Sequence, residues 1–295
     1  MDDLIRSPAS HYLAQVARVY GHLLGGCTTQ AVDRELADQL RAVYPAAEQV
    51  ARELRTLHAD IVRYVVSDGI TQLVDIGGGA GLPGPTHELA HKINANARVI
   101  YVDNDLLTAQ LMRAHLHREQ VPNCASVTAD LQNVYTTWAT VQETGLIDKT
   151  QPVALLLLGV LHTIDGYDLP DDDDYGIYRI IWQYTKLLPA GSLLAVTHLT
   201  TDAGAGTLLR PAIRANHLLS HAGIHLYPRD AARLPRLLDP LTPVNWRTEG
   251  PPAAYVWAGI GRKHTGQAGG RHGDAIARSC ARTRGLTASY TAVNS

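Results

Sequence analysis

A glycine-rich segment follows the first apolar run that has the length of a buried strand. The sequence VDIGGGAGLPG runs from Val74 to Gly84, and a helix is expected to begin near Pro85. Glycines let the backbone turn sharply and approach a ligand closely, and the following helix N-terminus adds N–H groups and a positive dipole. We therefore predict a ligand-binding loop in which Gly77 and Gly79 approach the ligand.

An acidic residue ends the next apolar run. The segment RVIYVDND covers residues 98 to 105, and Asp103 lies 26 residues after Gly77. A carboxylate at this place can accept hydrogen bonds from both ribose hydroxyls of a nucleoside. The two features together fit two kinds of cofactor. A dinucleotide site uses G-x-G-x-x-G and is usually apolar where this chain has Asp75, whereas an acid there suits a ligand with an ammonium group and no phosphate.

Two further segments place polar groups at the same edge of the predicted sheet. In SVTADL, residues 126 to 131, Asp130 could accept a hydrogen bond from the amino group of an adenine, and Leu131 could flank the ring. The central apolar run LLLLGVLHTID, residues 155 to 165, passes through Gly159. The carboxyl end of a central strand borders the ligand crevice of an open sheet, so these segments predict one nucleoside-binding crevice.

Four side chains are candidates for catalysis or for contact with the cofactor. His162 follows the central strand and has a pKa suited to proton transfer, so it is our candidate for a base or for orienting the acceptor; the alternative is a core histidine bonded to a backbone carbonyl. His198 ends the neighbouring strand and allows the same two interpretations. Tyr20 either bonds the carboxylate of the cofactor or packs its helix. Arg55 either holds that carboxylate or belongs to a solvated helix face.

The elements that must position these residues change in type after residue 67. Residues 9 to 66 place apolar side chains at three- and four-residue spacing, which predicts three helices. Short apolar runs then alternate with helix-length segments, which predicts βαβ units in a mainly parallel sheet that is covered on both faces. The runs are 71–76, 98–102, 125–129, 153–158 and 192–197, with helices expected from about 85, 105, 133, 172 and 207.

Two last strands, at 244–247 and 253–260, are expected to form an antiparallel hairpin at one edge. The predicted fold is therefore Rossmann-like α/β, with seven strands in a mostly parallel sheet. We divide the chain into an N-terminal helical cap (1–67), a cofactor-binding core (68–263) and a basic tail (264–295) that we expect to be disordered.

Composition excludes several classes of protein. Of the 295 residues, 45% are apolar and 18% are charged, and no apolar run approaches the about 20 residues that span a bilayer, so we expect no membrane partner. The net charge of −2 argues against a nucleic-acid partner. The chain has three well-separated cysteines and no basic stretch followed by an apolar segment at its start, which predicts a cytoplasmic protein with reduced thiols.

The motifs also resemble a known family. The string DIGGG…THELA (75–90) and RVIYVDND occur with RVYGHLLGG (18–26), VDRE (32–35), PVALLLLGVLHTI (152–164), LPAGSLLAVTH (188–198) and YVWAGIGRK (255–263). In this order they are similar to a family of actinobacterial S-adenosylmethionine-dependent methyltransferases that was long catalogued as a domain of unknown function. The resemblance runs from about residue 8 to 263 and implies a class I methyltransferase fold with an N-terminal helical cap.

The resemblance also implies roles for the motif residues. S-Adenosyl-L-methionine is the implied cofactor, and a small molecule is the implied acceptor. Gly77 and Gly79 would line the methionine part of the cofactor. Asp103 and Asn104 would contact its ribose, and Asp130 its adenine. Tyr20 and Gly25–Gly26 would close the cap over it. Some relatives look like enzymes that tailor actinomycete natural products, including indole-containing cyclic dipeptides, by C- or N-methylation.

The chain departs from the family pattern at several places. Cys27-Thr28-Thr29-Gln30 replaces the usual K-D-N-F after LLGG, Leu54 replaces the usual Asn before Arg55, and Thr163 replaces the usual Phe after LH. Two alternatives to a methyltransferase stay open: a nicotinamide-dependent oxidoreductase and a non-catalytic cofactor-binding regulator. The sequence leaves the oligomeric state open, a homodimer included.

We predict no metal site from the sequence. The string H-E-L-A-H (87–91) matches the zincin motif literally, but it lies directly behind the glycine turn and no third ligand is evident. The acidic run 171–174 cannot place four carboxylates on one ion. At a helix N-terminus such acids are favoured without a metal.

Overall fold

The computed structural model describes residues 14–26, 30–165, 175–201, 209–246 and 255–264. Residues 265–295 of the expected basic tail, the acidic run at 171–174 and residues 27–29, which depart from the family pattern, lie outside this part of the chain. No helix in the described part is both long enough and apolar enough to cross a bilayer.

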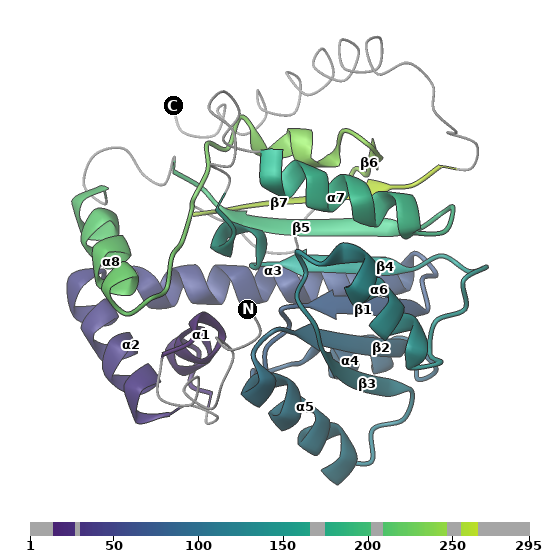
Figure 1. Cartoon of the computed structure of the whole chain (residues 1–295), viewed down its shortest axis with the longest axis horizontal. Coiled ribbons are helices and arrows are strands. Elements are labelled where there is room, and N and C mark those ends of the chain that lie inside the picture. The colour runs from purple at the N-terminus through teal and green to yellow at the C-terminus, as the bar shows by residue number, and fades with distance from the viewer. Residues whose placement is uncertain (1–13, 27–29, 166–174, 202–208, 247–254, 265–295) are drawn as a thin grey trace, which may run out of the picture.

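One mixed sheet organises the described residues (Figure 1). Its order is β3-β2-β1-β4-β5-β7-β6, and the five strands from β3 to β5 pair in parallel. β7 runs antiparallel to β5, and β6 runs antiparallel to β7. The predicted seven-stranded, mostly parallel sheet with an antiparallel edge is confirmed. The strands are β1 (Gln72–Ile76), β2 (Arg98–Asp103), β3 (Cys124–Thr128), β4 (Ala154–Leu158), β5 (Leu193–Leu199), β6 (Thr242–Pro243) and β7 (Val256–Arg262).

Successive side chains of the central strands point to opposite faces of the sheet, and each face packs against helices in a buried core. Val74 and Leu155 contact one core, beneath α6 (Val134–Glu143), α7 (Tyr175–Leu187) and the short helix η3 (Leu234–Leu238). Leu73 and Leu156 contact a second core, beneath α3 (Ala47–Ser67), α4 (Thr86–His91) and α5 (Leu106–Arg118). The strand order reverses between β1 and β4, which is where an open α/β sheet binds its ligand.

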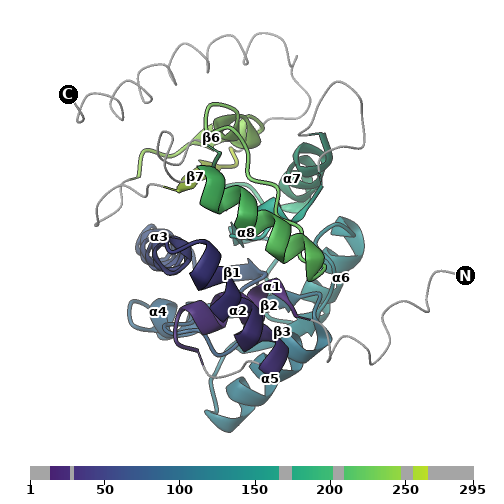
Figure 2. The same ribbon diagram turned by 90° about the vertical axis from the view of Figure 1, so that its left-hand side faces the viewer.

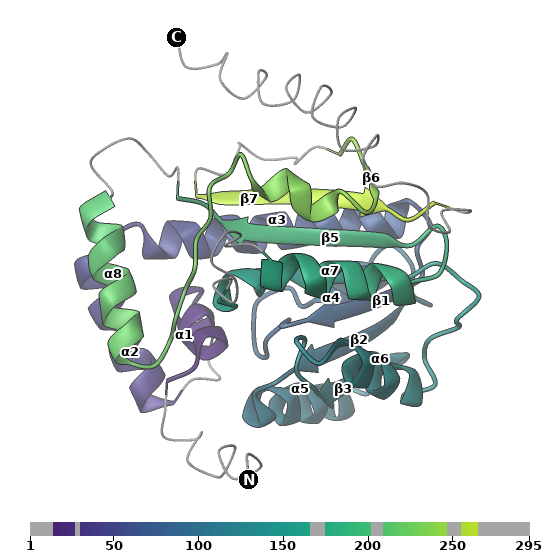
Figure 3. The ribbon, with the colours of Figure 1, turned by 45° about the horizontal axis from the view of Figure 1, so that its top comes forward.

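The cap is built from two distant parts of the chain. α1 (Val16–Leu23), α2 (Ala31–Val43) and the start of α3 share one apolar cluster with α8 (Leu209–His221), which follows β5. Leu36, Ala37 and Leu40 of α2 meet Ala215 and Leu219 of α8 in this cluster. Figures 2 and 3 show α8 beside α2, on the side of the molecule that also holds α1.

The structure corrects one predicted strand. The expected strand at 244–247 is wrong: the edge strand β6 is only Thr242–Pro243, and residues 244–246 are not part of a strand. Val244 still donates a backbone hydrogen bond to Ile260, after which Trp246 bonds back to Val244 instead of to β7. A proline lacks an N–H, which confines Pro243 to such a sheet edge. Residues 253 and 254 lie outside the described part, and β7 begins at Val256.

Candidate functional site

A cavity of about 560 Å³ lies between the carboxyl ends of the strands and the cap. The glycine loop and the ends of β1 to β5 form one side of it, and α1, α2, α3 and α8 form the other. Eleven of the thirteen predicted site residues line this cavity; Gly26 and His198 do not. The eleven are Tyr20, Arg55, Asp75, Gly77, Gly79, Asp103, Asn104, Asp130, Leu131, Gly159 and His162.

The glycine loop requires glycine for two reasons. Gly77 and Gly79 have φ angles of 77° and 68°, a region that residues with a Cβ rarely adopt. A Cβ at Gly77 would lie 3.0 Å from the side chain of Val160, and one at Gly79 would lie 2.9 Å from Leu82. The loop therefore presents bare backbone to the cavity, as the close approach of a ligand demands.

The carboxylate of Asp75 supports this loop from beneath. It is 1% exposed, accepts a hydrogen bond from the Thr86 hydroxyl at 2.5 Å, and lies 2.6 Å from where a Cβ of Gly78 would be. Thr86 is the first residue of α4, so Asp75 ties the start of that helix to the end of β1. This contact explains an acid at a position where dinucleotide-binding loops are usually apolar.

His58 of α3 extends the same network. Its Nε2 lies 2.7 Å from the Thr86 hydroxyl oxygen, and because that hydroxyl donates to Asp75, His58 must donate from Nε2. Nδ1 is then an acceptor, and it is buried without a hydrogen-bond partner. Burial and nearby Arg55 lower the pKa of His58, so the ring is neutral. His58 lines the cavity beside Arg55.

Asp103 lies at the end of β2 and faces the cavity. Its Oδ1 accepts a hydrogen bond from the backbone N–H of Asp105 at 2.9 Å, which orients the carboxylate. Burial raises the pKa of Asp103 to about 7, and the nearby Asp105 and Asp75 add to the increase. The neighbouring Asn104 is exposed at the rim. A half-buried carboxylate with few donors of its own can accept hydrogen bonds from a ligand's hydroxyls.

The expected adenine contacts lie one strand further along the sheet. Asp130 follows β3, and its Oδ1 accepts from the backbone N–H of Gln132 at 3.0 Å. Leu131 is 8% exposed and lines the cavity beside it. A flat ring in this place would have an apolar side chain against its face and an acceptor at its edge.

Arg55 points a cation at the glycine loop. Its Nε donates to the Pro83 carbonyl at 2.8 Å and its Nη2 to the Gly84 carbonyl at 2.5 Å. These bonds fix the guanidinium against the loop at the cavity wall. A guanidinium that is held in place in this way can bind a carboxylate with its remaining N–H groups.

His162 lines the cavity after the end of β4. It is 4% exposed, and its Nδ1 is buried without a hydrogen-bond partner. Burial, the neighbouring His198 and the cation of Arg229 lower the pKa of His162 well below its ordinary value. The ring is therefore neutral at physiological pH, and it is a weaker base than the sequence led us to expect.

The structure favours the second of the two interpretations of His198, a core histidine bonded to a backbone carbonyl. Its Nδ1 donates to the Leu199 carbonyl at 2.7 Å, and its Nε2 accepts from Arg229 at 3.0 Å, so both ring nitrogens are engaged. The ring is fully buried and stands edge-on to the ring of His162, with 5.5 Å between centroids. His198 thus supports His162 from behind without contact with the cavity.

Tyr20 and Gly26 join the cap to the core. The Tyr20 hydroxyl donates to the Ala51 carbonyl at 3.3 Å and links α1 to α3, while burial raises its pKa to about 12. A Cβ at Gly26 would lie 3.0 Å from the carbonyl oxygen of Gly81. Gly26 therefore lets the end of α1 approach the glycine loop, although it does not line the cavity.

Sequence reasoning missed a buried ion network beneath the cap. Arg18 of α1 donates to Asp33 of α2 at 2.8 Å and to Asp105 at 2.6 Å, and all three side chains are buried. Asp105 is the N-cap of α5, and its backbone N–H orients Asp103. The signal for Arg18 is a single charge among the apolar residues of α1, but nothing in the sequence names its partners.

Comparisons with known proteins agree with this geometry. Residues 8–249 match the model of the S-adenosyl methyltransferase family. The structure resembles that of a protein named as a methyltransferase from Thermobifida fusca YX, with 28% identity, a TM-score of 0.74, and coverage of 86% of this chain and 96% of that one. A DUF574 family protein from Streptomyces avermitilis MA-4680 has 24% identity, the same TM-score, and coverage of 86% and 99%.

More distant similarity concerns the fold alone. An O-methyltransferase family protein from Burkholderia thailandensis has 15% identity and a TM-score of 0.50, over 79% of this chain and 63% of that one. A comparison with curated protein sequences finds no match. Nothing in these comparisons supports the alternatives of a nicotinamide-dependent oxidoreductase or a non-catalytic regulator. The chain belongs to the S-adenosyl methyltransferase family and is a class I methyltransferase that depends on S-adenosylmethionine.

Proposed function

We propose that this enzyme methylates a small, largely apolar molecule that binds between the cap and the end of β5. The observation that supports this is the division of the cavity lining. Polar groups gather at the glycine loop and the strand ends, whereas the opposite part is lined mainly by apolar side chains. These include Leu40, Val50, Leu199, Ala212, Ile213, Ala215 and Leu219. Such a wall suits an apolar acceptor and offers nothing to a polyanion.

The polar part has the donors and acceptors that S-adenosylmethionine needs. Gly77 and Gly79 would border its methionine part, and Arg55 would bind the carboxylate. Asp103 would accept from the ribose hydroxyls, with Asn104 beside it. Asp130 and Leu131 would hold the adenine. The fit rests on the bare backbone of the loop, where a Cβ would meet Val160 or Leu82, and on the fixed guanidinium of Arg55.

The cofactor supplies a methyl group on a sulfonium, so the task of the chain is to align the acceptor with it. Alignment of two reactants can lower a barrier by about 7–11 kcal/mol. Tyr20 and Tyr44 border the cavity, and burial raises the pKa of each to about 12, so both stay neutral. We propose that neutral His162 orients the acceptor by accepting a hydrogen bond at a ring nitrogen, and that the acceptor needs no strong base.

Within this class, we propose an aromatic nitrogen heterocycle as the acceptor, with an indole of a cyclic dipeptide as the first compound to test. Natural-product tailoring by C- or N-methylation is the corresponding role. An N–H on such a ring would donate to His162, while the apolar wall would cover the ring faces. Cytoplasmic location remains a prediction.

A bulky residue in α8 tests the acceptor site separately from the cofactor site. Ala212 is half-buried and lines the apolar part of the cavity, and His217 lies exposed on the same helix outside the lining. We expect Ala212→Trp to keep its affinity for S-adenosylhomocysteine in calorimetry within about twofold. Transfer of an isotope-labelled methyl group to a small-molecule extract should fall by about tenfold or more, because a misplaced acceptor loses the benefit of alignment.

The matched control is His217→Trp, which adds the same side chain outside the cavity and should methylate like the wild type. Label that appears in the protein or RNA fraction instead of the small molecules would contradict the proposal. Equal transfer by Ala212→Trp and His217→Trp would place the acceptor elsewhere.

A further inference from the structure

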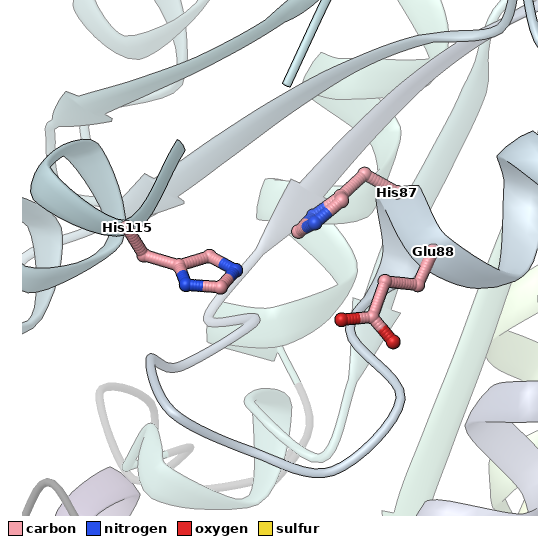
Figure 4. Close-up of side chains that lie close together, drawn as sticks. All are labelled: His87, Glu88 and His115. Carbon is pink, nitrogen blue, oxygen red and sulfur yellow. The ribbon is translucent and has the colours of Figure 1, made fainter. Parts of the chain in front are cut away.

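Three potential metal ligands meet between α4 and α5, and none of them lines the cavity. His87, Glu88 and His115 each bring one ligand atom within 4.8 Å of the others. Figure 4 shows the side chains of His87 and Glu88 extending from the start of α4 towards His115, which comes from α5. None of the three lines the cofactor cavity, so the cofactor does not account for them.

His87 is held in the orientation that a metal ligand needs. Its backbone N–H donates to the Tyr101 hydroxyl at 2.9 Å, and its Nδ1 lies 2.8 Å from the same oxygen. With Nδ1 engaged by Tyr101, Nε2 is the nitrogen left to bind an ion. Ligating histidines usually donate their other ring N–H to an oxygen, and Tyr101 is placed to accept it. Burial, with His115 and His91 nearby, lowers the pKa of His87 to about 4, so the ring is in the neutral form that metals bind.

His115 has one competing contact, and it is a weak one. Arg118 lies 3.3 Å from Nδ1 of His115, but the Arg118 side chain is 71% exposed and also pairs with Glu119. Binding of an ion at Nε2 of His115 would shift the ring hydrogen to Nδ1 and displace Arg118. Water can solvate the displaced guanidinium at little cost.

The helical pair of the H-E-L-A-H string is not the arrangement that forms. Nε2 of His91 lies 2.9 Å from the Ala97 carbonyl, and its ring centroid is 6.3 Å from that of His87. His115, which is 28 positions after His87 in the sequence, takes the third place instead. His115 comes close to His87 only because β2 and α5 fold back beside α4, so the sequence alone does not predict this contact.

We propose that His87, Glu88 and His115 bind one divalent transition-metal ion of the zinc class. Two imidazoles and a carboxylate are an established zinc donor set, with Zn–N distances of about 2.0–2.1 Å and an open fourth position for water. A ligand-atom separation of up to 4.8 Å closes to bonding distance by small rotations of Glu88, which is exposed, and His115, which is half-buried.

The ion would clamp α4 to α5. His87 follows Thr86, whose hydroxyl donates to Asp75 beneath the glycine loop. α4 has only six residues, so a bond from its first turn to α5 would fix the helix that begins directly after the loop. The role inferred is therefore structural, and it does not depend on the identity of the acceptor.

Zinc titration of the metal-free full-length chain, without an affinity tag, tests the site. We expect one Zn²⁺ per chain in calorimetry, a Tm increase of about 2 °C or more at saturation, and a tetrahedral absorption spectrum with Co²⁺. His115→Ala should lower the zinc affinity by about tenfold or more and remove the Tm increase, since it removes a ligand. Arg118→Ala should bind zinc at least as tightly as the wild type, because a competing cation is gone.

His117→Ala is the matched control, since His117 is exposed on the same helix. It should bind zinc within about twofold of the wild type. Equal zinc affinity in His115→Ala and His117→Ala, or no stoichiometric binding by the wild type, would overturn the proposal. S-Adenosylhomocysteine affinity should be the same in His115→Ala and in the wild type without metal, so failure here is separate from failure of the proposed function.

Discussion

Asp103 is a residue at which function and stability oppose each other. Its side chain is half-buried, and its pKa is raised to about 7 from an ordinary value of 3.8. A group whose pKa rises on folding contributes stability that is fully present below pH 3.8 and is lost as the pH rises towards 7. The folded chain without cofactor therefore holds an unfavourable charge at pH 8, and ribose hydroxyls would relieve it by donating to the carboxylate.

Replacement of Asp103 by Asn should expose this opposition. Asn keeps the acceptor for the Asp105 N–H but never ionises, so Asp103→Asn should raise Tm by roughly 2–4 °C at pH 8, as expected for about 1 kcal/mol. The gain should shrink towards pH 4, where the wild-type group is protonated. Thermal unfolding across this pH range measures it. A gain that stays constant with pH would show that Asp103 carries an ordinary pKa.

The ionisation of His162 should not produce an inflection in the pH profile of methyl transfer. Because its pKa lies well below 6.5, the ring stays neutral from pH 6 to pH 8. We expect His162→Gln to slow single-turnover transfer of labelled methyl by about tenfold or more, since a misplaced acceptor loses alignment, while the shape of the profile is retained. An inflection near pH 6.5 in the wild type that disappears in His162→Gln would instead identify His162 as a general base.

The sequence predicted residues at this site wherever one local signal was enough. The glycines and Asp103 follow directly from a strand–loop–helix pattern, and the structure places them in the cavity. His198 shows the limit. Thr197 and Leu199 line the cavity, while His198 between them does not, because successive strand side chains point to opposite faces. The face to which a given side chain points depends on the exact bounds of the strand, and these bounds are predicted poorly from sequence.

At the scale of elements, Arg18 connects α1, α2 and α5 through two buried carboxylates. Removal of the cation leaves Asp33 and Asp105 buried without it, so Arg18→Ala should destabilise the fold by about 3–5 kcal/mol. It should also weaken cofactor binding, because Asp105 orients Asp103. Urea unfolding and calorimetry with S-adenosylhomocysteine measure the two effects.

The control for this prediction is Arg52→Ala in α3. Arg52 is 63% exposed and pairs with Glu48 one helical turn away, a contact that contributes about 0.3–0.5 kcal/mol. Equal losses of stability in Arg18→Ala and Arg52→Ala would show that the buried network is not important for the cap.

The helices and strands themselves were largely predictable, since each has its own apolar period. The exception is the edge strand of the sheet, β6. Residues 244–247 look like a strand by composition, but the strand that pairs with β7 is only 242–243, and Val244 adds one further backbone hydrogen bond to Ile260. Pairing is a property of the partner strand and of the loop between, and neither is encoded in the residues of the edge strand.

At the scale of the whole molecule, the cavity has walls from both ends of the described chain. α8 begins more than 160 residues after the end of α2, yet the two share the cap's apolar cluster. The sequence predicted a cap of N-terminal helices and a helix after β5, but not their contact. The two helices, 31–43 and 209–221, are separated in the sequence by the first five strands of the sheet. A local pattern of residues does not encode a contact between segments so far apart in the chain.

The central claim is that a nucleoside cofactor binds where the strand order reverses between β1 and β4, with its ribose hydroxyls bonded to Asp103. Calorimetry of Asp103→Ala with S-adenosylhomocysteine tests this most directly, with Asp148→Ala, an exposed carboxylate far from the cavity lining, as the control. Hydrogen bonds to a charged group contribute about 1.5–3 kcal/mol, so Asp103→Ala should bind at least about tenfold more weakly while Asp148→Ala binds like the wild type. Folded Asp103→Ala with unchanged affinity would contradict the account.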